Sequence, residues 1–470
     1  MRQRLSQAAA TALPRSARQH RNLLGAFAMT AGAMVVLNVI GGVTGVIQSR
    51  AIGPFERGVL ATAVTWPSVI ICLVADGAPQ VAAYFVARQP ESRGAHACTT
   101  LALFGGISAV LATAGAGVVL LIGGPARGAL LVAFATLPAS TLVGVGTGTI
   151  LGLEDLRGWS LLRLLGPSVT LIGVLVAIAL GGRTALVIVG VIAISNVCQL
   201  AGVTRALHRR GLLARPRLGL VRPVVGYAWR NALNMGWIVS YQLDQLLLSI
   251  AVSPVQLGLY AVSASFGAVI IPIAAASGYV ILPRIAGRGA SEARRTLGPA
   301  IVVTAVTAGL ACLALFLTGR TVIGVLFGTG FYGAVTSLRI LMPGVVALAL
   351  SSVLSDTLRG LGRPLVAARA GAVGALLTCA LLAALIPPLG IRGAAIASSI
   401  TYITVAAIMA WGVRRELSSG PPAVAFSPHP SGPPASLDLD VPAVAAIGLP
   451  GDGVSDPVGD EEHEGDGAHG

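Results

Sequence analysis

The sequence predicts an all-α integral membrane protein with about twelve transmembrane helices in two parallel six-helix lobes around a central cleft. Of the 470 residues, 55% are hydrophobic and 11% are charged, and the mean hydropathy of +0.83 lies far above the range of soluble domains. Apolar runs recur that are long enough to cross about 30 Å of hydrocarbon, which needs roughly 20 residues per helix. The runs lack the period-two alternation of a membrane β-barrel, so the spans are expected to be helices.

The apolar runs are bounded by Arg, Gly or Pro. The expected spans are Leu23–Gln48, Val59–Phe85, Ala97–Ile122, Ala129–Leu151, Leu161–Leu180, Ala185–Thr204, Pro223–Ala251, Leu257–Leu282, Ala300–Leu317, Ser337–Val353, Leu365–Ile386 and Ala394–Val413.

The arginines predict the orientation of these spans. The net charge is +14, and the chain contains no lysine. When the loops are assigned alternately to the two sides, 25 of the 32 arginines fall on the side of the N-terminus and seven on the other. Cytoplasmic loops carry such an excess of basic residues, so both termini are expected to be cytoplasmic. This distribution explains the charge better than nucleic-acid binding does. The location predicted is a bacterial cytoplasmic membrane.

The chain divides into five expected regions. They are a basic cytoplasmic N-terminus (1–21), a first six-helix lobe (22–204), an Arg-rich cytoplasmic linker (205–222), a second six-helix lobe (223–415) and an acidic cytoplasmic tail expected to be disordered (416–470). Pro54-x-x-x-Gly58 in the first lobe recurs as Pro254-x-x-x-Gly258 in the second, which favours an internal duplication. Each half has an even number of spans, so the repeats run parallel, as in secondary transporters that rock two bundles about a cleft.

The seventh span carries a polar stripe that is a candidate substrate site. Most of its side chains fall within about 100° on a helical wheel, and Asp244 lies about 60° further round. The stripe either lines a hydrated cleft or joins helices through hydrogen bonds. Its candidate cleft residues are Asn231, Asn234, Tyr241, Gln242, Asp244 and Gln245.

Ionisable residues inside spans are costly and suggest further sites. Asp76 and Asp244 are candidates to bind a coupling ion, although Asp76 also fits a carboxylate at a helix end. Arg163, Arg230 and Arg369 lie just inside the cytoplasmic ends of three spans, where they either attract an anionic head group or extend to the interface as topogenic arginines.

Enzyme chemistry finds little support in the sequence. It contains no Gly-x-Ser-x-Gly, His-Glu-x-x-His or Walker motif, and the histidines lie outside the span centres. The five cysteines lie in or beside apolar spans without close pairs, which is typical of buried small side chains. We therefore expect no catalytic residues, no metal site and no cofactor.

Six short motifs occur in the order found in one family of exporters. They are Ile52-Gly-Pro-Phe-Glu-Arg-Gly58, Asp244-Gln245, Gly258-Leu-Tyr-Ala261, Leu326-Phe-Gly-Thr-Gly-Phe-Tyr332, Gly360-Leu-Gly-Arg363 and Pro388-Leu-Gly-Ile-Arg-Gly-Ala-Ala395. Over residues 22–415 the chain resembles the polysaccharide flippases of the multidrug/oligosaccharidyl-lipid/polysaccharide exporter superfamily.

This resemblance implies alternating access, in which a polyprenyl-linked oligosaccharide or polysaccharide precursor is flipped from the inner to the outer leaflet. It also implies as partners the lipid-linked glycan, the bilayer, and a glycan polymerase or glycosyltransferases. Two alternatives stay open. One is a cation-coupled multidrug exporter of the same superfamily, and the other is a non-transporting scaffold of a glycan-synthesis complex.

Overall fold

The computed structural model describes residues 15–74, 77–233 and 236–418, and these ranges contain helices and no strand. The first half comprises α2 (Arg15–Val74), α3 (Ala78–Arg88), η1 (Pro90–Ser92), α4 (Arg93–Ile122), α5 (Arg127–Ala135), α6 (Leu137–Gly152), α7 (Leu156–Ala179) and α8 (Ala185–Arg209). The second half comprises η2 (Leu218–Leu220), α9 (Val221–Leu233), α10 (Gly236–Ala251), α11 (Pro254–Leu326), η3 (Thr329–Phe331), α12 (Ala334–Gly360), α13 (Pro364–Leu389) and α14 (Ile391–Ser418). The predicted all-helical membrane fold is confirmed.

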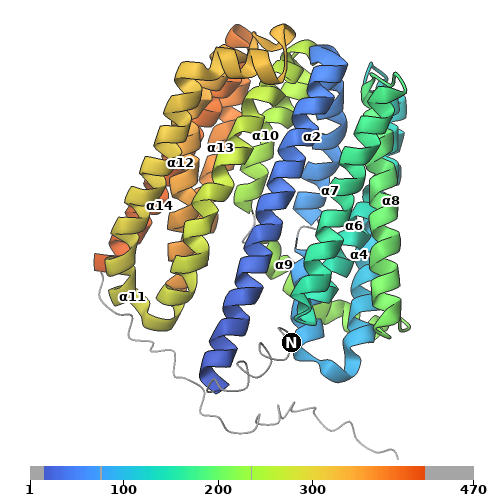
Figure 1. Cartoon of the computed structure of the whole chain (residues 1–470), viewed down its shortest axis with the longest axis vertical. Coiled ribbons are helices and arrows are strands. Elements are labelled where there is room, and N and C mark those ends of the chain that lie inside the picture. The colour runs from blue at the N-terminus through green and yellow to red at the C-terminus, as the bar shows by residue number, and fades with distance from the viewer. Residues whose placement is uncertain (1–14, 75–76, 234–235, 419–470) are drawn as a thin grey trace, which may run out of the picture. The chain divides into compact units, whose positions relative to one another are not determined.

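Several predicted spans are joined or divided in the structure. The first span and the first part of the second form α2, which is interrupted at Gly53, where φ is 77°, and α3 forms the rest of the second span. The eighth and ninth spans form the 73-residue α11, whose two legs run in opposite directions in Figure 1. The fourth span is divided into α5 and α6 beside Pro138, which fits only the first turn of a helix without loss of a hydrogen bond. Within the described ranges, nine helical segments are long and apolar enough to cross a membrane.

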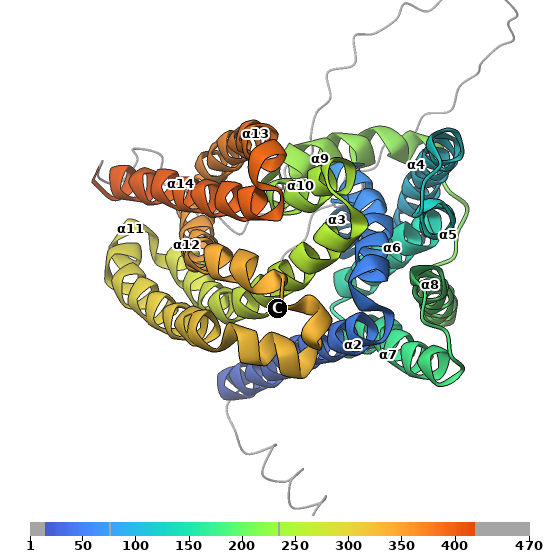
Figure 2. The same cartoon turned by 90° about the horizontal axis from the view of Figure 1, so that it is seen from above.

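The connections between spans alternate between two ends of the molecule. We name one of them the Gly53 end, because it holds the interruption in α2 together with the turns that follow α4, α7, α10 and α13. The other is the N-terminal end, which holds the turns that follow α3, α6, α8 and α12. Figure 2 shows α11–α14 gathered on one side and α4–α8 on the other.

Glycines let helices of the first half approach closely. A Cβ atom at Gly148 would lie 2.2 Å from the carbonyl oxygen of Pro79, and one at Gly152 would lie 2.5 Å from that of Ala83. These glycines lie one turn apart on α6 and face α3. Small residues at this spacing are a common means of helix association in lipid, where no hydrophobic force drives one apolar helix against another.

The linker and α9 pack against the first half of the chain. The backbone N–H of Arg217 donates to Thr99 Oγ1 at 2.9 Å, and that of Ala214 donates to Cys98 Sγ at 3.3 Å. Val224 on α9 is fully buried in a cluster with residues of α3, α4 and α6, and Tyr227 stacks on Tyr84 with ring centroids 4.4 Å apart. The second half therefore begins with a helix that is fixed to the first half.

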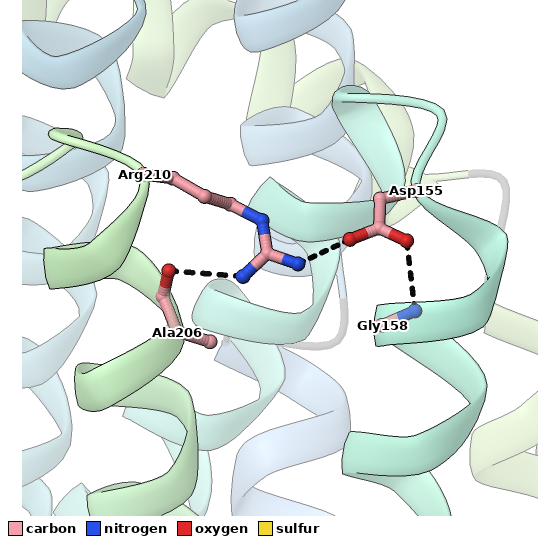
Figure 3. A network of polar contacts seen from close by, with 4 residues as sticks. All are labelled: Asp155, Gly158, Ala206 and Arg210. Carbon is pink, nitrogen blue, oxygen red and sulfur yellow. Dashed lines mark hydrogen bonds and ion pairs between the residues drawn. The ribbon is translucent and has the colours of Figure 1, made fainter.

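A polar network joins α7 and α8 at the N-terminal end (Figure 3). Asp155 caps α7, because its Oδ1 accepts from the backbone N–H of Gly158 at 2.8 Å, and its Oδ2 pairs with Arg210 Nη2. Arg210 Nη1 also donates to the carbonyl oxygen of Ala206 at 3.0 Å. The Gly158 N–H lowers the pKa of Asp155, and Arg210 lowers it further, whereas partial burial acts in the opposite sense.

Replacing Asp155 should separate its capping role from its charge. Asp155→Ala removes the cap and the ion pair, for an expected loss of about 1–2 kcal/mol, whereas Asp155→Asn keeps a capping oxygen and should cost about 1 kcal/mol or less. The folded state has the lower Asp155 pKa, so its stabilisation is complete above the unfolded-state pKa of about 4 and is lost as pH falls through the folded-state value.

Thermal unfolding midpoints in detergent, measured from pH 7 to pH 3, test this expectation. The difference between wild-type protein and Asp155→Asn should shrink as pH falls. A difference that is independent of pH would show that the carboxylate charge contributes nothing.

Candidate functional site

Asp244 lies at the centre of a buried polar cluster in the second half of the chain. It is 3% exposed and lies on α10. Its Oδ2 accepts from the hydroxyl of Tyr260 on α11 at 2.5 Å and from Ser398 Oγ on α14 at 3.2 Å. Its Oδ1 accepts from the backbone N–H of Gln245 at 2.7 Å. Three helices therefore converge on a single carboxylate.

The chemistry of this cluster is that of hydroxyl groups around a carboxylate. The three donors satisfy the oxygens of this buried carboxylate, and hydrogen bonds to a charged group are stronger than those between neutral groups. The hydroxyls of Tyr260 and Ser398 also contact each other at 3.2 Å, and either oxygen can be the donor. Because each hydroxyl can donate or accept, the cluster can hold one added proton on Asp244 without losing its contacts.

A pocket of about 50 Å³ with a mainly apolar lining and several polar side chains lies between α12, α13 and α14. Its polar lining includes Ser355, Asp356 and Arg359 from α12, and Tyr402 from α14. Asp356 Oδ1 is 3.6 Å from Arg359 Nη1, and the buried Ser355 Oγ has no hydrogen-bond partner in the described part of the chain. The polar groups at this pocket could bind ordered water, whereas the rest of its lining is apolar.

The cluster and the pocket are neighbours along α14. Ser398, which contacts Asp244, lies one helical turn before Tyr402, which lines the pocket. Hydroxyl-bearing side chains therefore continue along α14 from the buried carboxylate towards the N-terminal end of the molecule.

The structure describes only part of the stripe predicted on the seventh span. Gln242 and Gln245 are half-buried, and Gln242 Oε1 is buried without a hydrogen-bond partner among the described residues. Asp76 and Asn234, together with the side chains of Arg230, Asn231 and Tyr241, lie outside the described residues. The proposed cleft-lining role of the stripe stays a prediction.

The described head-group candidates lie in different halves of the chain. Arg163 lies on α7, with its guanidinium carbon 4.7 Å from the ring centroid of Trp159 and its Nη1 3.5 Å from Met34 Sδ. Arg369 is exposed on α13, less than two turns after that helix begins at Pro364. Contact with an aromatic ring stabilises a guanidinium at a partly buried position.

The sequence alone did not predict the partners of Asp244 or the polar residues at the pocket. Tyr260 belongs to the Gly258–Ala261 motif, but nothing in the sequence pairs it with Asp244, and Ser398 lies 154 positions away from that carboxylate. A usable signal was the group of hydroxyl-bearing residues in the last predicted span, which begins with the Ser398-Ser399 pair. Polar side chains at such positions need partners from other helices.

Removing the Tyr260 hydroxyl should destabilise the second half of the molecule. Tyr260→Phe leaves a buried carboxylate with one donor fewer, and we expect a loss of about 1–3 kcal/mol. Tyr332→Phe is a matched control, because Tyr332 is exposed. The measurement is the thermal unfolding midpoint in detergent. Equal midpoints for the two variants would contradict the importance of the cluster.

Comparison with known proteins agrees with this arrangement of helices. Lipid II flippase MurJ in an inward closed conformation has a TM-score of 0.71 at 12% identity, covering 83% of this chain and 89% of its own. An inward-facing multidrug resistance MATE family transporter of the MOP superfamily has a TM-score of 0.69 at 16% identity, covering 81% and 94%. A MOP superfamily transporter from Pyrococcus furiosus, described as having a binding pocket of reverse polarity, has a TM-score of 0.56 at 17% identity, covering 84% and 94%.

No family model and no curated protein matches the sequence. The likeness in structure nevertheless spans most of both chains in each comparison. The protein therefore has the two-lobed helical fold of the membrane transporters of the MOP superfamily.

Proposed function

We propose that this protein flips a polyprenyl-linked oligosaccharide or polysaccharide precursor across a bacterial cytoplasmic membrane, from the inner to the outer leaflet. In this proposal both termini are cytoplasmic, so the N-terminal end faces the cytoplasm. The two lobes rock about the cleft between them and expose it to each side in turn. A glycan polymerase and glycosyltransferases are the partners that would use or supply such a substrate.

The carboxylates inside the spans carry the proposal. Three of the carboxylates on the described helices are Glu56, Asp244 and Asp356, and each has a partner. Glu56 Oε2 accepts from the backbone N–H of Ala185 at 2.6 Å, Asp244 lies in the hydroxyl cluster, and Asp356 pairs with Arg359. These three carboxylates are engaged by neighbouring groups, whereas Arg163 and Arg369 carry positive charge near the N-terminal end.

The membrane potential favours outward movement of such a substrate. A pyrophosphate carries about two negative charges, and outward movement across about 100 mV, negative inside, releases roughly 4–5 kcal/mol at about 2.3 kcal/mol per charge. Coupling to an ion is therefore not required. Asp244 and Asp76 are the residues that we propose for a coupling ion or proton if the potential alone does not suffice.

Two observations bear on the identity of the cargo. The MurJ structure, with the TM-score of 0.71, belongs to a lipid II flippase, which supports a lipid-linked glycan. The MATE structure, with a TM-score of 0.69, belongs to a multidrug resistance transporter, and it keeps a cation-coupled multidrug exporter as the second candidate. The partnered carboxylates favour the flippase.

A deletion strain separates the two candidates. Loss of the flippase should cause lipid-linked intermediate to accumulate in the inner leaflet, because the glycan is too polar to cross unaided. The measurement is the amount and leaflet of that intermediate, and restoration by the wild-type gene is the control. Normal glycan export combined with drug hypersensitivity would identify the exporter instead.

The exposed Arg369 should attract the anionic head group. Arg369→Gln should lower the initial flipping rate about fivefold, since one basic residue near a membrane surface contributes about 1 kcal/mol. Arg369→Lys should keep most of the rate, because it keeps the charge.

Flipping of a fluorescent polyprenyl-pyrophosphate disaccharide in proteoliposomes provides the measurement. Arg183→Gln is the matched control, because Arg183 is also exposed but lies at the Gly53 end. Equal rate losses in Arg369→Gln and Arg183→Gln would show that the position of the charge is irrelevant.

A further inference from the structure

The two copies of the Pro-x-x-x-Gly sequence pack against each other reciprocally. A Cβ atom on Gly58 would lie 1.7 Å from the carbonyl oxygen of Pro254. A Cβ atom on Gly258 would lie 2.0 Å from the carbonyl oxygen of Pro54 and 2.9 Å from the backbone nitrogen of Gly58. The Cα–H group of each glycine therefore points at the proline carbonyl oxygen of the other copy. Both segments are the first turn of a helical stretch, and we call residues 54–58 and 254–258 the paired turns.

This reciprocity is the pattern of a two-fold contact between identical surfaces. In such a contact, residue i of one partner meets residue j of the other, and j meets i in turn. Here both partners belong to one chain, and the equivalent positions are 200 residues apart in the sequence. The internal duplication thus supplies a self-complementary surface at the point where the two halves meet.

Other contacts between the halves surround the paired turns. Arg50 Nη1 donates to the carbonyl oxygen of Val325 at 2.8 Å, and Trp66 Nε1 donates to Ser249 Oγ at 3.0 Å. Ala61 of α2 belongs to the hydrophobic cluster formed by α10–α14. The residues of α2 that make these contacts lie between positions 50 and 66, on both sides of the Gly53 interruption.

Glycine Cα–H groups and proline carbonyl oxygens meet where the paired turns approach each other. Contact between a glycine Cα–H and a carbonyl oxygen is weak individually, and it depends on an approach that only glycine permits. Such a contact holds two surfaces in one register and still separates without extracting a buried charge from its partner. These properties suit an interface that forms and breaks in each transport cycle.

We propose that the paired turns are the contact that closes the Gly53 end of the cleft, with Gly58 and Gly258 as the residues that determine how stably it closes. The turns separate when this end opens and meet again when it shuts. The inference rests on the proposed alternating-access function, and it adds which residues form the closing contact.

The closed end should be sensitive to a single methyl group at either glycine. Gly58→Ala and Gly258→Ala each place a Cβ atom against backbone atoms, which have no rotamer into which to move. We expect each change to reduce the closed population relative to the open one by about tenfold or more, as overpacking against fixed atoms does. The double variant should reduce the closed population at least as much as either single variant does.

Distances between spin labels across the Gly53 end measure these populations. Labels on Pro125→Cys and Thr321→Cys, at exposed positions of the first and second halves, are introduced after the five native cysteines are replaced by alanine. Pulsed electron paramagnetic resonance on the full chain in detergent should give a short main distance in the wild-type background and a longer one in the glycine variants.

Two glycines serve as matched controls on the same helices. A Cβ atom at Gly45 on α2 or Gly309 on α11 meets nothing within 4 Å, so Gly45→Ala and Gly309→Ala should keep the wild-type distances. Unchanged distances in folded Gly58→Ala and Gly258→Ala would overturn the proposal, and so would an equal shift in the controls.

Trp66→Phe covers the case in which the glycine variants fail to fold. This change removes the hydrogen bond to Ser249 beside the paired turns and adds no atoms, so a several-fold shift towards the longer distance is expected, and no shift would count against the proposal. No substrate is present in the measurement. A chain that fails to flip lipid-linked glycan yet shows these distance changes would refute the flippase and retain the closing contact.

Discussion

Close approach of helix backbones is the constraint on which the rest of this structure depends. Lipid is as apolar as leucine, so helices in a membrane gain little from burying apolar side chains against each other and associate instead through tight packing. Glycines provide that packing within the first half, where Gly148 and Gly152 meet α3, and between the halves, where Gly58 and Gly258 meet backbone carbonyls. Close packing at glycines therefore holds helices together within one half of the chain and also joins the two halves.

A second constraint follows from the same solvent, because polar groups inside a membrane must find partners in the protein. Many hydroxyls do so within their own helix, as Thr44 does by donating to the carbonyl oxygen of Ile40 at 2.7 Å. Asp244 instead draws donors from two other helices. Gln242 Oε1 and Ser355 Oγ are two of five buried side-chain atoms that have no hydrogen-bond partner in the described part of the chain. Such atoms are natural places for water or cargo to bind.

Fold and cargo are decided by different features of this molecule. The two-lobed arrangement is shared with a flippase and with a multidrug transporter at similar TM-scores, so the arrangement alone does not select a substrate. Charge does so more directly. Glu56, Asp244 and Asp356 are engaged by neighbouring groups, whereas Arg369 is exposed at the N-terminal end and Arg163 is held against Trp159. This distribution of charge is what supports the proposal of an anionic head group.

The sequence by itself determined the helical membrane class, the approximate spans and the recurrence of Pro54-x-x-x-Gly58 at Pro254, because hydropathy and short motifs are local properties of the chain. It also singled out Asp244 as an unusual charge in a span. Only the tertiary structure decided that Tyr260 and Ser398 bond to this carboxylate, that α9 packs against the first half, and that the two repeated turns face each other. These contacts join residues separated by 16 to 204 positions. Their partners depend on how whole helices pack, which no local pattern encodes.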